Sequence, residues 1–372
     1  MRLYEYVLRR IILMVFVLLG VTLIVFYLGR GLLPPESALA PYITPRMNDG
    51  TKLQLARSLG VATISCPSWS ALASHESVCL VPIWGQYLSW LGNVLAGNWG
   101  YSLLPGLSGT QTTWYVFWLR FPYTAELAVA GTILTALVAI PLGIISATRN
   151  NRLPDHISRF ISLGGYSVPA FWFGLILQLL FVLYIRVGGN ALLPSNGVLD
   201  TSCALCLSSP GQVTGYTGTP ILDALLSLNP AYFWDSLVAL ALPTLTLAIT
   251  SIGALTRILR SSMMEVLKQD YILLARSKGL KERVVIYRHA LKNAVLPSIT
   301  ITGLLFALLL GGVVIVEVVF SWPGVGAASV VASTVVDVNF LELYVLVTAF
   351  IIVLTNLLVD IIYAKLDPRI RY

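Results

Sequence analysis

Charged residues are scarce in this sequence. Lys, Arg, Asp and Glu together make up 11% of the 372 residues, whereas 57% are hydrophobic and the mean hydropathy is +0.82. A soluble domain of this composition would leave much apolar surface in contact with water. The composition therefore excludes a soluble globular protein and favours a chain that lies largely in lipid.

Groups suited to catalysis or nucleotide binding are also missing. No Gly-Lys-Ser or Gly-Lys-Thr occurs, so the chain lacks the phosphate-cradling loop of P-loop ATPases. The three histidines, His75, His156 and His289, are scattered, and no nucleophile, base and orienting group occur together. We expect a chain without catalytic residues, without a bound cofactor and without a metal site.

Six runs that contain no Asp, Glu, Lys or Arg are long enough to cross a membrane as helices. The first follows Arg9-Arg10 and has no small-residue cleavage site at its end, so we interpret it as a retained span rather than a signal peptide. The sequence predicts an all-α polytopic membrane protein with six transmembrane helices and external loops between helices 1 and 2 and between helices 3 and 4. The six runs are Ile11–Leu28, Leu127–Thr148, Phe160–Ile185, Ser236–Thr256, Asn293–Val316 and Leu343–Val359.

The net charge of +7 follows this topology. With the N-terminus inside, 18 of the 24 Lys and Arg residues fall on the cytoplasmic side and six on the outer side. That bias obeys the positive-inside rule, so the excess charge indicates orientation rather than binding of nucleic acid. We expect a multi-pass protein of the cell membrane with both termini in the cytoplasm.

The outer segments carry four cysteines and a group of aromatic residues. Cys66, Cys79, Cys203 and Cys206 allow three disulfide pairings, and an oxidising exterior favours disulfides over free thiols or a metal site. Residues Val81–Leu91 have aromatic and apolar side chains at helical spacing, which suits a helix on the outer membrane surface or a platform for an external protein. The acidic segment Val187–Asp235 is expected to be a solvated connector, with a short helix at Thr219–Leu226.

The stretch Thr256–Pro297, here called the basic loop, holds nine of the 24 basic residues and lies between two apolar runs. Its apolar residues recur at helical spacing on both sides of Gly279, where the chain must turn. We expect two short amphipathic cytoplasmic helices that dock into another protein. Their apolar faces are predicted to be Met263, Leu267, Tyr271 and Leu274 before Gly279, and Val284, Tyr287 and Leu291 after it.

Within the basic loop, Ala275–Leu280 followed by Arg288–Pro297 resembles the coupling loop of ABC-importer permeases, and in particular the B-type permease of dipeptide, oligopeptide and nickel uptake systems. Two further stretches resemble the same family: Ser321-Trp322-Pro323-Gly324 and the C-terminal Leu366–Tyr372. Two features depart from the general loop motif: Leu273 stands where the motif has Glu, and the distance from Gly279 to Pro297 is longer.

The resemblance implies the type I ABC importer transmembrane fold and a set of partners. These are a second homologous permease subunit, two ABC ATPase subunits that carry Mg-ATP, and an extracytoplasmic solute-binding protein. It also implies an ATPase-coupling role for Asp270, Ala275, Arg276, Ser277, Lys278, Gly279 and Leu280. The expected domains are helix 1 (1–33), an extracytoplasmic segment with interfacial helices (34–119), the permease core (120–364, coupling loop about 257–293) and a cytoplasmic tail (365–372).

The turn after the fifth run is a candidate gate on the translocation path. It comprises Glu317, Trp322, Pro323 and Gly324. An acidic residue at the edge of a span is a functional candidate, but a hydrogen-bonded carboxylate that positions the turn is an equal alternative. Glu126 and Asp360 raise the same question.

For the substrate, the resemblance favours di- and oligopeptides, with oligosaccharides and nickel complexes as alternatives. An ATP-independent secondary transporter would be expected to carry charged pairs in its span centres, which are almost free of charge here. A receptor would need a soluble output domain, and no predicted cytoplasmic segment is long enough for one.

Overall fold

A computed structural model describes residues 3–31, 39–43, 46–59, 61–63, 65–74, 79–105, 111–187, 190–197, 217–311 and 313–366. The chain forms two compact units. Unit 1 comprises residues 1–10, 122–327 and 351–372, and unit 2 comprises residues 11–121 and 328–350. The domains expected from the sequence are continuous stretches of the chain, whereas these units are defined by contacts between residues. Several long helices therefore have one part in unit 1 and the other in unit 2.

Within the described residues, four helices are by themselves long and apolar enough to cross a membrane. Helix α1 continues as a π-helical turn, Tyr27–Gly31, so that its apolar stretch runs over Leu8–Gly31. Pro122 and Pro141 lie inside a single helix, α6, rather than ending it. The four are α1 (Leu3–Phe26), α6 (Thr113–Thr148), α10 (Pro230–Val266) and α17 (Val338–Leu366).

Two bent helix pairs supply the remaining spans. The first joins α7 (Leu153–Ser167) to α8 (Ala170–Leu179) and its π-helical end Leu180–Tyr184, and the break falls at Pro169, before which helical backbone is disfavoured. The second begins with α12 (Glu282–Val284), runs to Ala294 and continues as α14 (Leu296–Leu310), with a bend of 55°. With each pair counted as one span, the described helices give the six that the sequence predicts.

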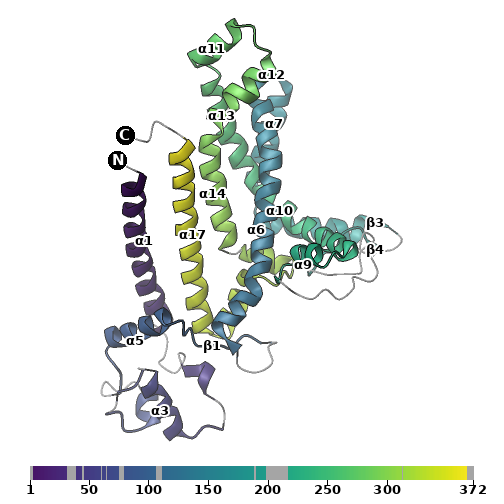
Figure 1. Ribbon diagram of the computed structural model, residues 1–372. Helices are drawn as coiled ribbons and strands as arrows, with labels where there is room; N and C mark the ends of the chain where they lie inside the picture. The colour runs from purple at the N-terminus through teal and green to yellow at the C-terminus, as the bar shows by residue number, and fades with distance from the viewer. Residues whose placement is uncertain are drawn as a thin grey trace. The chain divides into compact units, whose positions relative to one another are not determined.

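Unit 1 is built around α10, which packs against α7, α8, α9 (Pro220–Leu226) and α14 (Figure 1). Its cores are apolar, with Leu127, Leu242 and Leu255 fully buried. Further short elements of this unit are α15 (Val314–Val319), α16 (Val325–Thr334, partly in unit 2), and the strands β3 (Arg186–Val187) and β4 (Asn190–Ala191).

The connector before α10 differs from the expectation of a solvated loop. Asp223 lies in α9 and is 5% exposed, and Asp235 lies inside α10 and is 3% exposed. Asn229 caps α10 by accepting a hydrogen bond from the backbone N–H of Tyr232, with Pro230 at the first helical position. Because of this cap, α10 begins six residues before the predicted span Ser236–Thr256. Asp235 therefore lies within the helix and is buried. The predicted short helix at Thr219–Leu226 is confirmed as α9.

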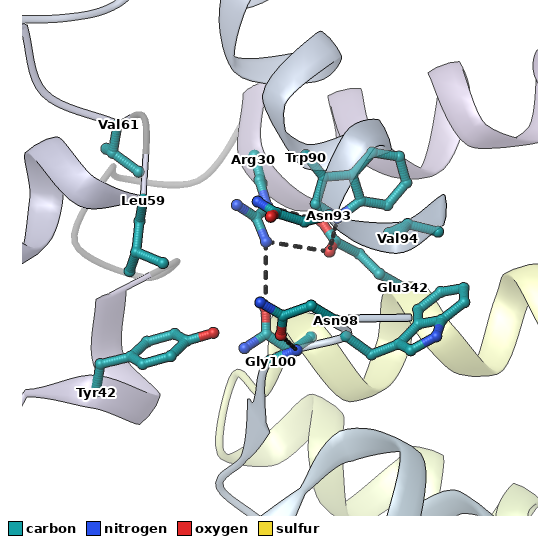
Figure 2. A pocket seen from close by; sticks show the side chains of 12 residues that line it. Arg30, Tyr42, Leu59, Val61, Trp90, Asn93, Val94, Asn98, Gly100 and Glu342 are labelled. Carbon is teal, nitrogen blue, oxygen red and sulfur yellow. Dashed lines mark hydrogen bonds and ion pairs between the residues drawn. The ribbon is translucent and has the colours of Figure 1, made fainter. Parts of the chain in front are cut away.

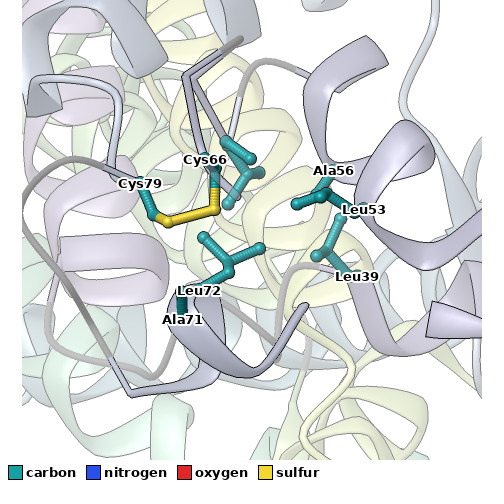
Figure 3. Packing of buried hydrophobic residues seen from close by; sticks show 9 residues of the cluster. Leu39, Leu53, Ala56, Cys66, Ala71, Leu72 and Cys79 are labelled. Carbon is teal, nitrogen blue, oxygen red and sulfur yellow. A yellow bond between two sulfur atoms is a disulfide. The ribbon is translucent and has the colours of Figure 1, made fainter. Parts of the chain in front are cut away.

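In unit 2, the segment between α1 and α6 has a small core of its own. Cys66 and Cys79 form a disulfide, and both lie in an apolar cluster with Leu39, Leu53 and Leu72 (Figure 3). Of the three pairings the sequence allowed, this bond fits only the one that joins Cys66 to Cys79, while Cys203 and Cys206 lie outside the described part of the chain. A disulfide that closes a loop of this size stabilises the fold by about 3 kcal/mol, which compensates for the few buried side chains. The helices here are η2 (Ala40–Tyr42), α3 (Asp49–Ser58) and α4 (Trp69–Ala73).

The predicted aromatic helix is confirmed as α5 (Ile83–Leu95). Tyr87 and Trp90 are buried beside Phe26, while Trp84 is 66% exposed. The indole N–H of Trp90 donates to Glu342, whose carboxylate also pairs with Arg30 at 3.0 Å, as Figure 2 shows. Because Glu342 is 3% exposed, this pair and the indole provide the partners that a buried carboxylate requires. The strands of this unit are β1 (Tyr101–Ser102) and β2 (Gln111–Thr112), paired antiparallel.

Helices α7 and α10 cross at two glycines. A Cβ on Gly253 would collide with the carbonyl oxygen of Ser162, and one on Gly165 would lie 2.5 Å from the carbonyl oxygen of Ile249. Small residues allow this close approach in lipid, where helix association depends on packing.

We expect Gly253→Ala to force α7 and α10 apart at a cost of about 2 kcal/mol. The melting temperature in detergent should fall by roughly 5 °C. Gly164→Ala is the matched control, because a Cβ there meets no atom within 4 Å. Equal melting temperatures for the two variants would contradict the close crossing.

Candidate functional site

The basic loop projects from one end of the unit 1 helices, called here the loop end (Figure 1). After α10 it forms α11 (Asp270–Ser277), turns, and continues through α12 (Glu282–Val284) and the π-helix η4 (Val285–Ala290) into α13 (Leu291–Ala294). The two short helices on either side of Gly279 are therefore present, and the second is continued by the π-helix.

The loop is held by a buried apolar cluster. Ile272 and Ala275 of α11, Val285 of η4 and Leu259 and Met263 of α10 are all 7% exposed or less. A fully buried side chain of the size of Leu or Ile contributes about 2 kcal/mol. The loop is thus a packed extension of α10 rather than a free segment.

The predicted apolar positions before Gly279 divide between a buried side and an exposed side, with Met263 fully buried. Tyr271 and Leu274 are 40% and 56% exposed, and the residues that point inward are Ile272 and Ala275. The cause is the break between α10, which ends at Val266, and α11, which begins at Asp270, because it resets the helical phase. After Gly279, Tyr287 is likewise 54% exposed, while Val285 is buried.

Large apolar side chains are therefore exposed in a loop that is otherwise basic. Exposed beside the cations are Tyr271, Leu273, Leu274, Leu280 and Tyr287. Exposed apolar groups gathered on a rigid, packed element are typical of a protein interaction surface.

The turn at Gly279 has the left-handed backbone that glycine tolerates, with φ +73°. Arg276, before the turn, makes two hydrogen bonds to the carboxylate of Glu282 after it, at 3.2 and 2.6 Å. The Glu282 carboxylate raises the pKa of Arg276 because it favours the charged form. The ion pair spans the turn and fixes α11 relative to α12.

The remaining residues of the predicted coupling loop lie along the same turn. Asp270 is the first residue of α11 and is exposed, as expected for an acidic side chain at a helix N-terminus. The Ser277 hydroxyl donates to the carbonyl of Leu274 at 2.9 Å, and Lys278 ends the helix. Leu280 is 40% exposed, whereas Ala275 faces the core.

At the base of the loop, Asp155 joins three segments of unit 1. Its carboxylate is fully buried and accepts hydrogen bonds from Arg260 Nε at 2.9 Å and Arg159 Nε at 3.1 Å. Ser146, at the end of α6, and the backbone N–H of Asn151 complete the set. The turn between α6 and α7 is thereby tied to Arg260, which lies in the part of the basic loop that still belongs to α10.

Sequence reasoning missed this cluster. In the sequence, residues 149–159 are simply the short link between the second and third apolar runs, and Arg260 is 105 positions away from Asp155. The only local signal was an Asp in the first turn of a helix with an Arg four residues later, a pattern that is common on exposed helices.

Glu317, at the far end of unit 1, is also fully buried. Its two carboxylate oxygens accept hydrogen bonds from the Thr124 hydroxyl and the backbone N–H of Ala327, both at 2.7 Å. A Cβ on Gly324 would collide with this carboxylate. Trp322 is 1% exposed and donates its indole N–H to the carbonyl of Tyr123 at 2.9 Å. These contacts fit a carboxylate that positions the turn around Pro323, and the gating role remains a prediction.

The other acidic residues singled out from the sequence also have partners. Glu126 accepts a hydrogen bond from the backbone N–H of Ile221 at 2.9 Å, and Asp360 pairs with Arg10 at 3.2 Å. Within the described residues, no group of three or more His, Cys, Asp or Glu is placed to hold a metal ion.

Comparison with known proteins identifies the family. The profile of the family described as binding-protein-dependent transport system inner membrane component matches residues 139–372, which include α7, α10, the basic loop and the Glu317 turn. The chain belongs to this family.

Relatives of this permease resemble it over most of their length. It is 36% identical to a di/tripeptide transport system permease protein of Pseudomonas aeruginosa, over 82% of this chain and 86% of that one. It is 32% identical to an oligopeptide transport system permease protein of Bacillus subtilis over 99% of both chains. A probable D,D-dipeptide transport system permease protein of Escherichia coli is 39% identical over 78% of this chain and 80% of its own.

Family membership establishes the membrane fold of the chain and the kind of transport system to which it belongs. The permease is a multi-pass membrane protein with the type I ABC importer membrane fold. Permeases of such systems work with ATPase and binding-protein partners.

The hydrogen bonds of Glu317 predict a structural role that can be separated from gating. In Glu317→Gln the amide cannot satisfy both donors as a carboxylate does, and we expect a loss of about 2 kcal/mol in the free energy of unfolding. Thermal unfolding in detergent measures it, with Glu265→Gln, at an exposed position of α10, as the control. Unchanged stability together with lost transport would instead favour the gate.

Proposed function

We propose that this permease is the non-catalytic membrane subunit of an ATP-driven importer of di- and oligopeptides. The observation that carries the proposal is the basic loop, whose inward face packs into a buried cluster while its outward face presents exposed apolar side chains. Such a surface receives a partner and passes on its displacement, because the packed side chains beneath it cannot slide independently.

The distribution of charge supports the orientation. The loop end bears the nine Lys and Arg residues of the basic loop together with Arg149 and Arg152 of the α6–α7 turn and Arg159 of α7. By the positive-inside rule this end faces the cytoplasm, where ATP is available. The N- and C-termini then lie on the same side.

Mechanistically, two ATPase subunits carrying Mg-ATP grip the basic loop of this chain and the equivalent loop of a second, homologous permease. Their closure draws the loops together. The ion pair across Gly279 and the apolar cluster carry the displacement to α10, and Asp155 carries it to α6 and α7. The two permeases then alternate between inward-open and outward-open arrangements, and an extracytoplasmic binding protein delivers the substrate.

For the substrate, peptides are favoured because the relatives are permeases of peptide transport systems. Oligosaccharides and nickel complexes remain alternatives, since the binding protein selects the cargo. An ATP-independent transporter is disfavoured because the six apolar runs contain no Asp, Glu, Lys or Arg, whereas such a transporter would be expected to carry charged pairs in its span centres.

If the exposed face of α11 receives the ATPase, Leu274→Glu should abolish co-purification of the ATPase subunits. The fold should remain intact because Leu274 is 56% exposed. Leu226→Glu on α9, 61% exposed and outside the basic loop, is the control and should leave co-purification unchanged. Normal assembly of the Leu274 variant would contradict the docking role.

The substrate class is tested with the purified binding protein of the same transport system. We expect calorimetric titration to give binding heats with di- and oligopeptides and none with oligosaccharides or nickel complexes. In vesicles containing the complete complex, peptide uptake should require ATP inside and persist when ion gradients are abolished. Uptake that follows an ion gradient without ATP would refute the importer assignment.

A further inference from the structure

Helix α5 of unit 2 lies across the end of α1 that is remote from the N-terminus (Figure 1). Phe26 of α1 packs against Tyr87 and Trp90 of α5, with ring centroids 5.5 and 5.4 Å apart. The Tyr87 hydroxyl is hydrogen-bonded to the hydroxyl of Thr22 at 2.9 Å. The two helices are therefore joined by aromatic packing and by a polar contact within the span itself.

These contacts place α5 at the depth of the lipid chains. The apolar stretch of α1 has 24 residues and ends at Gly31, so it is about 36 Å long, whereas the hydrocarbon core is about 30 Å thick. Thr22 and Phe26 lie about 13 and 7 Å along the helix from Gly31. Both residues are inside the hydrocarbon core when the span is centred in it, and the side chains of α5 that reach them enter the same layer.

The side chains of α5 divide into three sides. Tyr87 and Trp90 form a buried side, and Ser89 and Asn93 belong to an exposed polar side. The third side is apolar and mostly exposed, and its residues recur every three or four positions, so they share one helical face. The three of its residues that are most exposed have exposed fractions from 65% to 79%. This side, called here the α5 stripe, consists of Trp84, Leu88, Leu91 and Leu95.

A groove of 370 Å³ connects the α5 stripe to α1. Apolar side chains of both helices form its walls, among them Leu23, Ile24, Tyr27, Leu28, Ile83 and Trp84. Ile24, Tyr27 and Leu28 are each more than half exposed and belong to the span. The exposed apolar surface of the span therefore continues through the groove onto the α5 stripe without a polar boundary.

This position decides between the two roles that the sequence left open for the aromatic helix. A soluble external protein does not enter the hydrocarbon layer, so it is not suited to fill a groove whose walls include Leu23 and Ile24 of the span. Lipid chains already surround an exposed span at this depth. A helix with one apolar and one polar side is also the form that lies in a membrane interface.

We propose that α5 is immersed in the outer leaflet, with the α5 stripe in contact with acyl chains, its polar side toward water, and one acyl chain in the groove. Trp84 and Tyr27, at the groove, have the aromatic rings that favour the membrane interface. Helix α5 contains no Asp, Glu, Lys or Arg, so the attachment is apolar and needs no anionic headgroup. The choice of the outer leaflet rests on the orientation proposed above, whereas the immersion itself does not.

Immersion would let α5 anchor the outer segment of the chain. On its buried side, the indole N–H of Trp90 donates to Glu342 at the start of α17, at 2.8 Å. The helix therefore holds α17 on one side and the membrane on the other. The outer segment would then keep a fixed depth relative to the outer ends of α1 and α17.

Fluorescence quenching in vesicles that contain the complete transporter tests the immersion. In a background with Cys203→Ser and Cys206→Ser, Leu88→Cys is labelled with bimane. We expect phosphatidylcholine brominated in the upper part of its acyl chains to quench the label by about half, because the apolar side of an interfacial helix lies about 5–10 Å into the boundary between headgroups and chains. Iodide in the water should have little effect. Brominated phosphatidylglycerol should quench equally, because α5 is uncharged.

Two further labelled positions complete this test. Leu95→Cys, on the same stripe and 79% exposed, should respond as Leu88→Cys does. Ser89→Cys, next to Leu88 but on the polar side, is the matched control and should respond to iodide alone. All three positions are exposed, so the substitutions leave the packing of α5 intact.

Bound lipid tests the groove. After delipidation in detergent, native mass spectrometry of the complex should show one phospholipid fewer per permease in Trp84→Ala, which removes a wall of the groove. Leu95→Ala, on the stripe but outside the groove, should retain the full number. Equal retention in the two variants would contradict an acyl chain in the groove.

Two results would overturn the immersion of α5. A Leu88 label quenched by iodide and not by brominated lipid would place the α5 stripe in water. A label protected from both quenchers would mean that a protein covers the stripe, and omitting the binding protein from the vesicles would show whether it is the cover. Either result leaves the importer assignment untouched, because ATP-dependent uptake is measured separately.

Discussion

The ion pairs of Asp155 are the interaction on which the loop end of unit 1 depends. A fully buried carboxylate is costly unless all its lone pairs are used, and here two arginines, a serine and a backbone N–H use them. The donors come from the end of α6, the start of α7 and the end of α10. Removing Arg260 would leave a buried charge short of partners, so the three segments can move only together.

Glu317 provides the same kind of constraint at the other end of the unit. It collects donors from α6 and from the start of α16, and Gly324 and Gly326 leave room for its carboxylate. Between these two clusters the packing is apolar and close, with Gly165 and Gly253 at the crossing of α7 and α10. An apolar helix bundle in lipid gains little specificity from hydrophobicity alone. Buried carboxylates with directional partners at both ends fix the register of the helices.

Patterns along the chain predicted the six spans, the break at Gly279 and the helices α5 and α9, because each depends on local composition. The inward face of α11 was not predictable in the same way, since a three-residue break between Val266 and Asp270 changes the helical phase. Long-range pairs were harder still. Nothing near Asp155 indicates Arg260, and the spacing of the cysteines did not single out Cys66 and Cys79 from three pairings. Such contacts depend on tertiary packing, which local propensity does not encode.

The exposed apolar residues of the basic loop constrain what surrounds it. They are preceded and followed by cations, and the loop extends past the ends of α6 and α10, so the bilayer interior cannot cover them. Left in water, a surface with Leu273, Leu274 and Tyr287 would favour association with any apolar surface. The packing of Ile272 and Val285 prevents the loop from turning that surface inward, because both inward positions are already filled. This face is therefore suited to a protein partner, which could bury these side chains without disturbing the cluster beneath them.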